Sequence, residues 1–217
     1  TDFFYNIEQY IIDHSDPEDP LLAALNRETN LKVLRPRMLS GHLQGKILEM
    51  ISKMVRPKKI LEIGTYTGYS AICLAKGLPG NGILHTIEIN DELEHFIRKY
   101  FQKAGLENKV KLHIGNALEI IPNLNQTFDL VFIDGDKRQY STYYQTIFDY
   151  VKPGGFILAD NVLWSGKVIE LESPDDDYTR GIFKFNDLIT KDDRIEKVIL
   201  PLRDGLTLIR KKLKNSH

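Results

Sequence analysis

Three charged side chains follow an apolar run near the middle of the chain. The run, Leu130 to Ile133, is typical of a buried strand, and Asp134, Asp136 and Lys137 come directly after it. A turn needs no such crowding of charge, so these residues indicate a site at the end of the strand. Carboxylates can hold a metal ion or a cationic ligand, and an ammonium can stabilise an anion.

A second polar pair, Asp160 and Asn161, follows the next expected strand. If the two strands are neighbours, Asp134, Asp160 and Asn161 converge at one edge of a sheet. Three oxygen donors without a nearby Cys or His suit a hard cation, with Mg²⁺ expected and Mn²⁺ or Ca²⁺ as competitors. Asp-Gly and Asp-Asn are also ordinary turn dipeptides, but two of them on adjacent strands beside Lys137 favour a site.

Two upstream features point to a nucleoside-like ligand. Gly64 and Gly68 bracket a turn from a strand into a helix, and Glu88 lies 24 residues after Gly64, near the distance at which an acid meets ribose hydroxyls. The turn lacks both the dinucleotide pattern G-x-G-x-x-G and the GK[ST] tail of a phosphate-binding loop. We therefore expect an adenosine-type ligand without a pyrophosphate; the alternative is a plain turn and an exposed glutamate.

From about residue 58 the pattern alternates between strand and helix. The expected strands are 58–64, 82–89, 110–115, 128–134, 154–160, 195–202 and 206–212, and the expected helices are 69–78, 91–105, 139–151 and about 179–190. Near-continuous apolar strands between helices predict an α/β fold with a doubly wound, mostly parallel sheet. Asp204-Gly205 predicts a closing hairpin that adds an antiparallel strand. Ligands bind such sheets at the carboxyl ends of the strands, where the candidate residues lie.

The first 57 residues do not follow this alternation. Residues 41–55 have an apolar face at helical spacing, and 3–13 and 18–27 are expected as short helices. We expect residues 1–57 to be an N-terminal helical extension packed on a domain of residues 58–217, which together form one structural domain.

Composition excludes several classes of partner. The 217 residues carry a net charge of −1, which gives no global attraction for nucleic acid or membrane. The apolar runs are far shorter than the ~20 residues of a membrane helix, and the N-terminal residues lack the pattern of a signal peptide. Cys73 is the single cysteine, which fits a reducing compartment, so a cytoplasmic protein is expected.

The motifs, taken in order, resemble those of the cation-dependent O-methyltransferases, a family that includes catechol and caffeoyl-CoA O-methyltransferases. They are LEIGTYTGYS, IEIN, GNAL, FIDGDK, KPGGFILADNVLWSG and LPLRDGLTLIRK, and the resemblance covers residues 35 to 212. It implies the class I methyltransferase (Rossmann-like) fold with a seven-stranded sheet, S-adenosylmethionine as methyl donor and a divalent cation. It also implies a homodimer and a small-molecule phenolic substrate.

The resemblance also implies a role for each matching residue. The donor would be bound by Met38, Ser40, Glu62, Gly64, Thr65, Ser70, Glu88, Ala117 and Asp136. The metal ligands would be Asp134, Asp160 and Asn161, with Lys137 as the proposed general base. Asp134 and Lys137 would also meet the substrate, against an aromatic wall at Trp164.

The chemistry agrees with this assignment. Methyl transfer to oxygen is an in-line displacement, and a phenol of pKa ~10 is a poor nucleophile at neutral pH. A metal that holds two adjacent oxygens lowers that pKa and fixes the line of attack. Lys137 could then accept the proton or stabilise the phenolate. We therefore expect a vicinal-dihydroxy aromatic (catechol-like) acceptor.

Other acceptors and functions remain as alternatives. A caffeoyl-CoA-type thioester carries several phosphates, whereas residues 170–177 contain Glu170, Glu172, Asp175, Asp176 and Asp177 and no cation, although Arg35, Arg37 and Arg180 could lie nearby. A nicotinamide-dependent oxidoreductase is less favoured because the dinucleotide pattern is absent. A nucleic-acid methyltransferase is disfavoured by the net charge.

Overall fold

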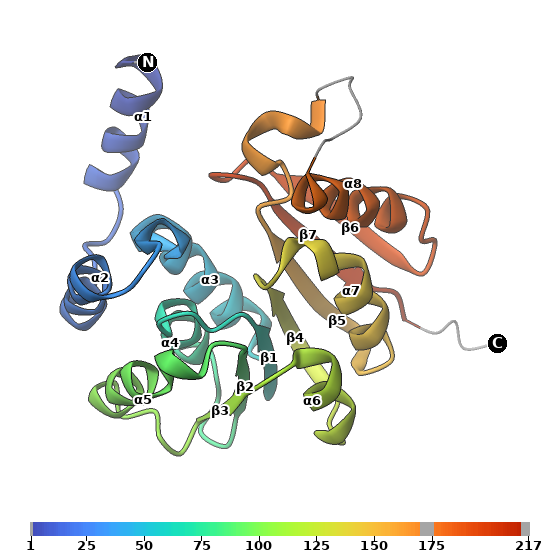
Figure 1. Ribbon diagram of the computed structural model, residues 1–217, viewed down its shortest axis with the longest axis horizontal. Coiled ribbons are helices and arrows are strands. Elements are labelled where there is room, and N and C mark those ends of the chain that lie inside the picture. Colours follow the sequence, from blue (N-terminus) through green and yellow to red (C-terminus); the bar gives the residue numbers. More distant parts are fainter. Residues whose placement is uncertain (1, 170–175, 214–217) are drawn as a thin grey trace.

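A seven-stranded sheet with strand order β3-β2-β1-β4-β5-β7-β6 forms the centre of the molecule. The structure, a computed structural model, describes residues 2–169 and 176–213 (Figure 1). The strands are β1 (Lys59–Ile63), β2 (Ile83–Glu88), β3 (Val110–Ile114), β4 (Phe128–Ile133), β5 (Val151–Asp160), β6 (Ile195–Leu200) and β7 (Leu206–Lys211). Pairing is parallel except at β7, which runs antiparallel to both β5 and β6. The expected sheet and its closing hairpin are confirmed.

Helices cover both faces of the sheet. The helices are α1 (Asp2–Asp13), α2 (Pro20–Lys32), α3 (Gly41–Val55), α4 (Tyr69–Ala75), α5 (Glu94–Lys103), α6 (Ala117–Asn123), α7 (Tyr140–Phe148) and α8 (Asp177–Thr190). Short 3-10 turns lie at η1 (Pro36–Met38), η2 (Asp91–Leu93), η3 (Lys137–Gln139) and η4 (Trp164–Ile169). Figure 1 shows α3, α4 and α5 on one side and α6, α7 and α8 on the other. Within the described part of the chain, no helix has both the length and the apolar character needed to cross a membrane.

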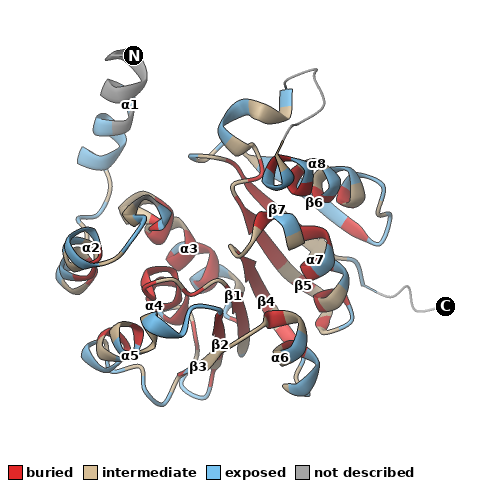
Figure 2. Ribbon diagram, in the orientation of Figure 1, coloured by how far each residue is buried: buried red, intermediate tan, exposed pale blue. Residues whose placement is uncertain are grey.

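Two apolar cores result, one on each face. Alternate residues of a strand point to opposite faces, so Ile60 joins the core under α3, α4 and α5, while Leu61 joins the core under α6, α7 and α8. Both side chains are fully buried, and the central strands are buried along most of their length (Figure 2). A sheet buried on both faces holds its strand ends rigidly, which suits it to carry a site.

Two local features differ from the sequence-based expectation. The helix α6 was not expected, because it is short and contains Pro122; the Asn116 side chain caps it by accepting from the Leu118 backbone N–H. The expected helix 139–151 ends at Phe148, and β5 begins at Val151, earlier than predicted. A register shift in the β4–β5 pairing accommodates this early start.

The N-terminal helices pack to different degrees. Gly45 of α3 lies against α4 so closely that a Cβ there would lie 2.5 Å from the Tyr69 ring. In α2, Leu22 and Leu25 are buried in the core. By contrast, α1 projects away from the body of the molecule (Figure 1), with Tyr10 63% exposed. The division at residue 57 stays a prediction.

Candidate functional site

One cavity of ≈ 740 Å³ lies at the carboxyl ends of β1, β2, β4 and β5, where the order of the strands reverses. Most of the predicted site residues line it. They are Met38, Ser40, Gly64, Glu88, Ala117, Asp134, Asp136, Lys137, Asp160, Asn161 and Trp164. Residues from six distant parts of the chain therefore meet in one hollow.

Glu62, Thr65 and Ser70 are not among the residues that line this cavity. All three are buried behind the turn after β1. Glu62 accepts hydrogen bonds from Ser70 Oγ and Thr86 Oγ1, each at 2.5 Å, and Thr86 Oγ1 lies 2.5 Å from Thr65 Oγ1. Burial raises the pKa of Glu62 to about 8. This network holds the turn in shape, and direct contact of these residues with a donor stays a prediction.

Gly64 allows the turn to approach the end of β4. Its φ is 98°, in the left-handed region that favours glycine, and a Cβ there would lie 2.3 Å from the Asp134 carbonyl oxygen. The Asp134 backbone N–H also donates to the Ile63 carbonyl at 2.8 Å. The glycine thus lets the donor-side turn and the Asp134 segment share one wall of the cavity.

Glu88 is held at the end of β2 by two backbone groups. Its Oε2 accepts from the Tyr66 N–H at 2.7 Å, and its Oε1 accepts from the Asn90 N–H at 2.9 Å. Glu88 is 7% exposed. Burial raises the pKa of its carboxyl, although these hydrogen bonds act in the opposite direction. Each oxygen keeps a lone pair for a further donor, which suits a pair of vicinal hydroxyls.

Asp134, Asp160 and Asn161 meet at the ends of β4 and β5, which are paired neighbours as expected. Asn161 has a φ of 59°, a left-handed conformation that Asn tolerates better than most residues. Asp160 is 4% exposed; its burial, followed by the nearby charge of Asp134, raises its pKa to about 6.

This donor set fits a hard cation. The nearby charges of Asp134 and Asp160 repel each other, which a divalent ion would relieve, and the third donor is an amide oxygen. Across residues 2–169 and 176–213, no cluster of three or more His, Cys, Asp or Glu side chains is placed to hold a metal, so this mixed set is the candidate.

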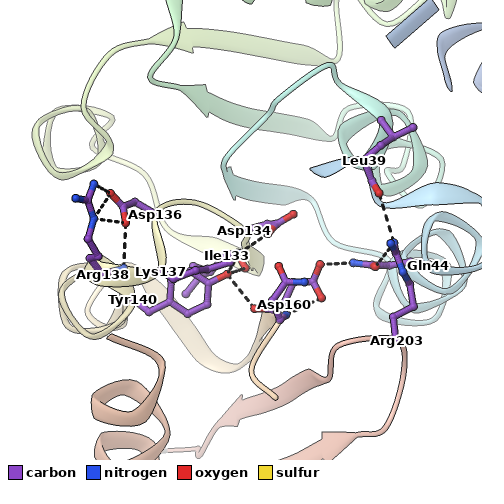
Figure 3. Close-up of polar contacts among 11 residues, drawn as sticks. Leu39, Gln44, Ile133, Asp134, Asp136, Lys137, Arg138, Tyr140, Asp160 and Arg203 are labelled. Atoms are coloured by element: carbon purple, nitrogen blue, oxygen red, sulfur yellow. Dashed lines mark hydrogen bonds and ion pairs between the residues drawn. The ribbon is translucent and has the colours of Figure 1, made fainter. Parts of the chain in front are cut away.

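Lys137 links the two candidate metal-binding aspartates. Its Nζ donates to Asp134 Oδ1 and to the Tyr140 hydroxyl, each at 2.7 Å (Figure 3). The Tyr140 hydroxyl is 2.9 Å from the Asp160 carbonyl, to which it can donate. Gly181 of α8 lies against this segment, because a Cβ there would lie 2.3 Å from the Lys137 carbonyl oxygen. The ammonium is thereby held at the cavity wall in a buried position.

A second group of contacts fixes the loop before α3, which carries Met38 and Ser40. The Tyr66 hydroxyl donates to the Leu34 carbonyl at 3.1 Å and to the Arg35 carbonyl at 3.2 Å as alternatives. Arg203 Nη1 donates to the Ser40 carbonyl and reaches the Leu39 carbonyl at 3.4 Å. The loop therefore lies over the cavity in a defined position.

Tyr178 lies beside Trp164 and beside the guanidinium that pairs with Asp136. Arg138 pairs with both oxygens of Asp136, and its guanidinium lies 4.8 Å from the Tyr178 ring centroid. Trp164 stacks on Tyr178 with ring centroids 6.4 Å apart, and its Nε1 donates to Thr179 Oγ1 at 3.0 Å. An aromatic wall at Trp164 thus extends into the first turn of α8.

Cationic side chains lie beside the part of the acidic segment that the structure describes. Glu170, Glu172 and Asp175 lie outside the described residues. Asp176 pairs with Lys167 at 3.2 Å and caps α8 through the Thr179 N–H, and Asp177 pairs with Arg180. The two acids that the structure describes therefore have cationic partners, and Arg35 lines the cavity.

Sequence reasoning missed several residues of the site. Gln44, Tyr66, Tyr140 and Arg203 carry the contacts that hold the predicted residues in place. Tyr140 is fully buried in α7, and its hydroxyl is part of the site. The one signal available was position, since Tyr140 follows Lys137 by three residues and thus lies within one turn of it.

Comparisons with known proteins agree with the geometry. A family model described as O-methyltransferase matches residues 12–212. Caffeoyl-CoA O-methyltransferase 1 of Zea mays is 35% identical over 95% of this chain and 84% of its own length. The catechol O-methyltransferase of Niastella koreensis is 34% identical over 94% of this chain and 96% of its own length.

Solved structures show the same fold. The O-methyltransferase TomG of Streptomyces achromogenes, solved with SAM, has a TM-score of 0.88 and 28% identity over 95% of this chain and 96% of its own. The Podospora anserina methyltransferase PaMTH1, solved with SAH, has a TM-score of 0.88 and 29% identity over 97% and 96%. These likenesses confirm the class I methyltransferase fold. The chain belongs to the O-methyltransferase family, which confirms the enzyme class and the resemblance drawn from its motifs.

Proposed function

We propose that this protein transfers a methyl group from S-adenosylmethionine to one oxygen of a vicinal-dihydroxy aromatic molecule, with the help of a divalent cation. The observation that carries the proposal is the meeting of Glu88, Lys137 and the oxygen donors Asp134, Asp160 and Asn161 in one cavity. A ribose-binding acid, a cation-binding set and an ammonium are the parts that this reaction requires.

The donor fits the side of the cavity formed by β1 and β2. Glu88 offers two free lone pairs to ribose hydroxyls, and Ala117 and Met38 offer apolar surface. Asp136 offers negative charge for an ammonium group, although Arg138 already pairs with it. The SAM and SAH in related solved structures support this choice of donor.

The cation fits the opposite side, where Asp134, Asp160 and Asn161 would hold it. When bound, a divalent cation supplies a Lewis acid that lowers the pKa of a phenol. Mg²⁺ is the proposed ion, because all three donors are oxygens, with Mn²⁺ or Ca²⁺ as competitors.

Lys137 acts on the acceptor from its anchored position. The Asp134 carboxylate and the Tyr140 hydroxyl hold its Nζ. There the ammonium stabilises the developing phenolate, and in its neutral form it could accept the phenolic proton. Trp164 and Tyr178 provide the flat surface on which an aromatic ring can lie.

A CoA thioester is the second candidate acceptor, and sequence similarity supports it as well as it supports a free catechol. The plant caffeoyl-CoA enzymes and the bacterial catechol enzyme are equally similar to this chain. Ion pairs at Asp176 and Asp177 also weaken the argument from acidity. The nicotinamide-dependent oxidoreductase is set aside, because the chain belongs to the O-methyltransferase family.

We also propose a homodimer in the cytoplasm. Exposed apolar side chains on α1, namely Ile7, Tyr10, Ile11 and Ile12, offer a surface to a second copy. The buried thiol of Cys73 fits a reducing compartment. No nucleic-acid or membrane partner is proposed.

A screen of paired acceptors tests the proposal. Caffeate and p-coumarate differ by one hydroxyl. If caffeate is methylated and p-coumarate is not, the protein recognises two adjacent oxygens. Caffeoyl-CoA is the third acceptor in the screen. A higher kcat/KM for caffeoyl-CoA than for caffeate would favour the thioester, and rapid methylation of p-coumarate would contradict recognition of a vicinal diol.

A further inference from the structure

Gln44 and Arg203 extend the cation-binding set into the N-terminal helices and the final hairpin. We propose that Gln44, oriented by Arg203, is a positioning residue that fixes the Asp160 carboxylate for metal binding. This inference rests on the proposed metal-dependent function. Neither residue belongs to the predicted ligand set.

Gln44 lies between a carboxylate and a guanidinium. It is 2% exposed in α3, and its Nε2 donates to Asp160 Oδ2 at 2.5 Å. Its Oε1 accepts from Arg203 Nη1 at 2.9 Å, so the three side chains form one line (Figure 3). Gln44 and Arg203 are 159 residues apart in the sequence, so this row of three side chains forms only in the folded molecule.

The two partners allow only one orientation of the Gln44 amide. An arginine side chain can only donate, and a carboxylate can only accept. The amide oxygen must therefore face Arg203, and the amide nitrogen must face Asp160. A residue without both an acceptor and a donor at this place cannot satisfy both neighbours, and an unsatisfied buried group is costly.

The contact leaves Asp160 prepared for a cation. Its Oδ1 accepts from the Asn161 N–H at 2.8 Å and its Oδ2 accepts from Gln44, which fixes the plane of the carboxylate. Each oxygen has a second lone pair for an ion. Outer contacts of this kind orient metal ligands, and their loss commonly weakens metal binding by 10–100-fold.

Arg203 also joins this line to the loop over the donor side. Its Nη1 donates to the Ser40 carbonyl, and Ser40 lines the cavity. One guanidinium therefore contacts both the donor-side loop and the group that orients Asp160.

The test measures Mn²⁺ affinity by electron paramagnetic resonance on the full chain without acceptor. We expect Gln44→Leu to weaken Mn²⁺ binding by roughly 10–100-fold. Ser52→Ala is the matched control, because Ser52 is buried in the same helix and donates to the Leu74 carbonyl away from the cavity. The control should lower stability and leave Mn²⁺ affinity unchanged.

A double-mutant cycle separates positioning from general damage. Arg203→Met should weaken Mn²⁺ binding in the native background and should have no further effect in the Gln44→Leu background. Gln44→Asn, which keeps the amide but is too short to reach both partners, replaces Gln44→Leu if that variant does not fold.

The outcomes are distinct. If the native protein binds Mn²⁺ and the Gln44 variants bind it equally well, the positioning role is wrong while the proposed function stands. If Arg203→Met weakens Mn²⁺ binding equally in both backgrounds, Arg203 does not act through Gln44. If the native protein does not bind Mn²⁺, the metal-dependent function and this inference both fail.

Discussion

Replacing Glu88 tests whether the end of β2 holds the donor ribose. Both carboxylate oxygens already accept one backbone N–H, from Tyr66 at 2.7 Å and from Asn90 at 2.9 Å. Each oxygen therefore has one lone pair for a ribose hydroxyl. Glu88→Gln keeps the size of the side chain but turns one of these acceptors into a donor.

The magnitude follows from the contacts. A hydrogen bond to a charged group contributes about 1.5–3 kcal/mol, and an amide loses the charge at both oxygens. In the glutamine variant one NH₂ group would also face a backbone N–H, either that of Tyr66 or that of Asn90. We expect Glu88→Gln to weaken S-adenosylhomocysteine binding by about 2–3 kcal/mol, or roughly 30–150-fold.

Isothermal titration calorimetry with two ligands isolates the ribose. S-adenosylhomocysteine and its 2′,3′-dideoxy analogue differ only in the hydroxyls, so Glu88→Gln should weaken the first far more than the second. Chemical unfolding without ligand separates this effect from lost stability, since Glu88 also fixes two backbone groups. An equal loss for both ligands would refute ribose recognition by Glu88.

Two further predictions concern the acceptor side and stability. Lys137→Met should lower kcat by roughly 10²–10⁴-fold with little change in donor affinity. If positive charge suffices, Lys137→Arg should recover part of the lost kcat. If both variants are as active as the native protein, Lys137 has no part in the chemistry. Burial, with the charge of His113 next, lowers the pKa of His85 to about 4, so its stabilising effect is present above pH 6.5 and lost as the pH falls toward 4. Between pH 7.5 and 5.5 this effect lowers the free energy of unfolding by about 1.4 kcal/mol. Urea unfolding at the two pH values should show that His85→Gln loses this share of the pH dependence, whereas the control His95→Gln, at an exposed position, keeps it.

The strands could be predicted because near-continuous apolar runs indicate strands that are buried on both faces of a sheet. Leu130 to Ile133 and the polar residues that follow were placed correctly, since strand ends of a parallel sheet share one edge. The helix α6 was missed because Pro122 lies inside a segment of only seven residues. Local sequence carries too little signal for such an element.

The contacts around the site could not be predicted. Gln44 and Asp160 are 116 residues apart, and Gln44 and Arg203 are 159 apart, so no spacing rule links them. Motif position also predicted that Glu62 binds the donor; its carboxylate is buried with Ser70 and Thr86 and does not line the cavity, so its contact with a donor stays a prediction. A motif identifies a segment, but packing decides which of its side chains reach the cavity.

Methyl transfer to caffeate with and without metal tests the central claim most directly. The full chain, stripped with EDTA and supplied with S-adenosylmethionine, should be inactive until Mg²⁺ is added, and Asp160→Ala should stay inactive with Mg²⁺ while its affinity for S-adenosylhomocysteine is retained. Full methylation of caffeate by the stripped protein, with metal analysis showing no bound ion, would contradict the account.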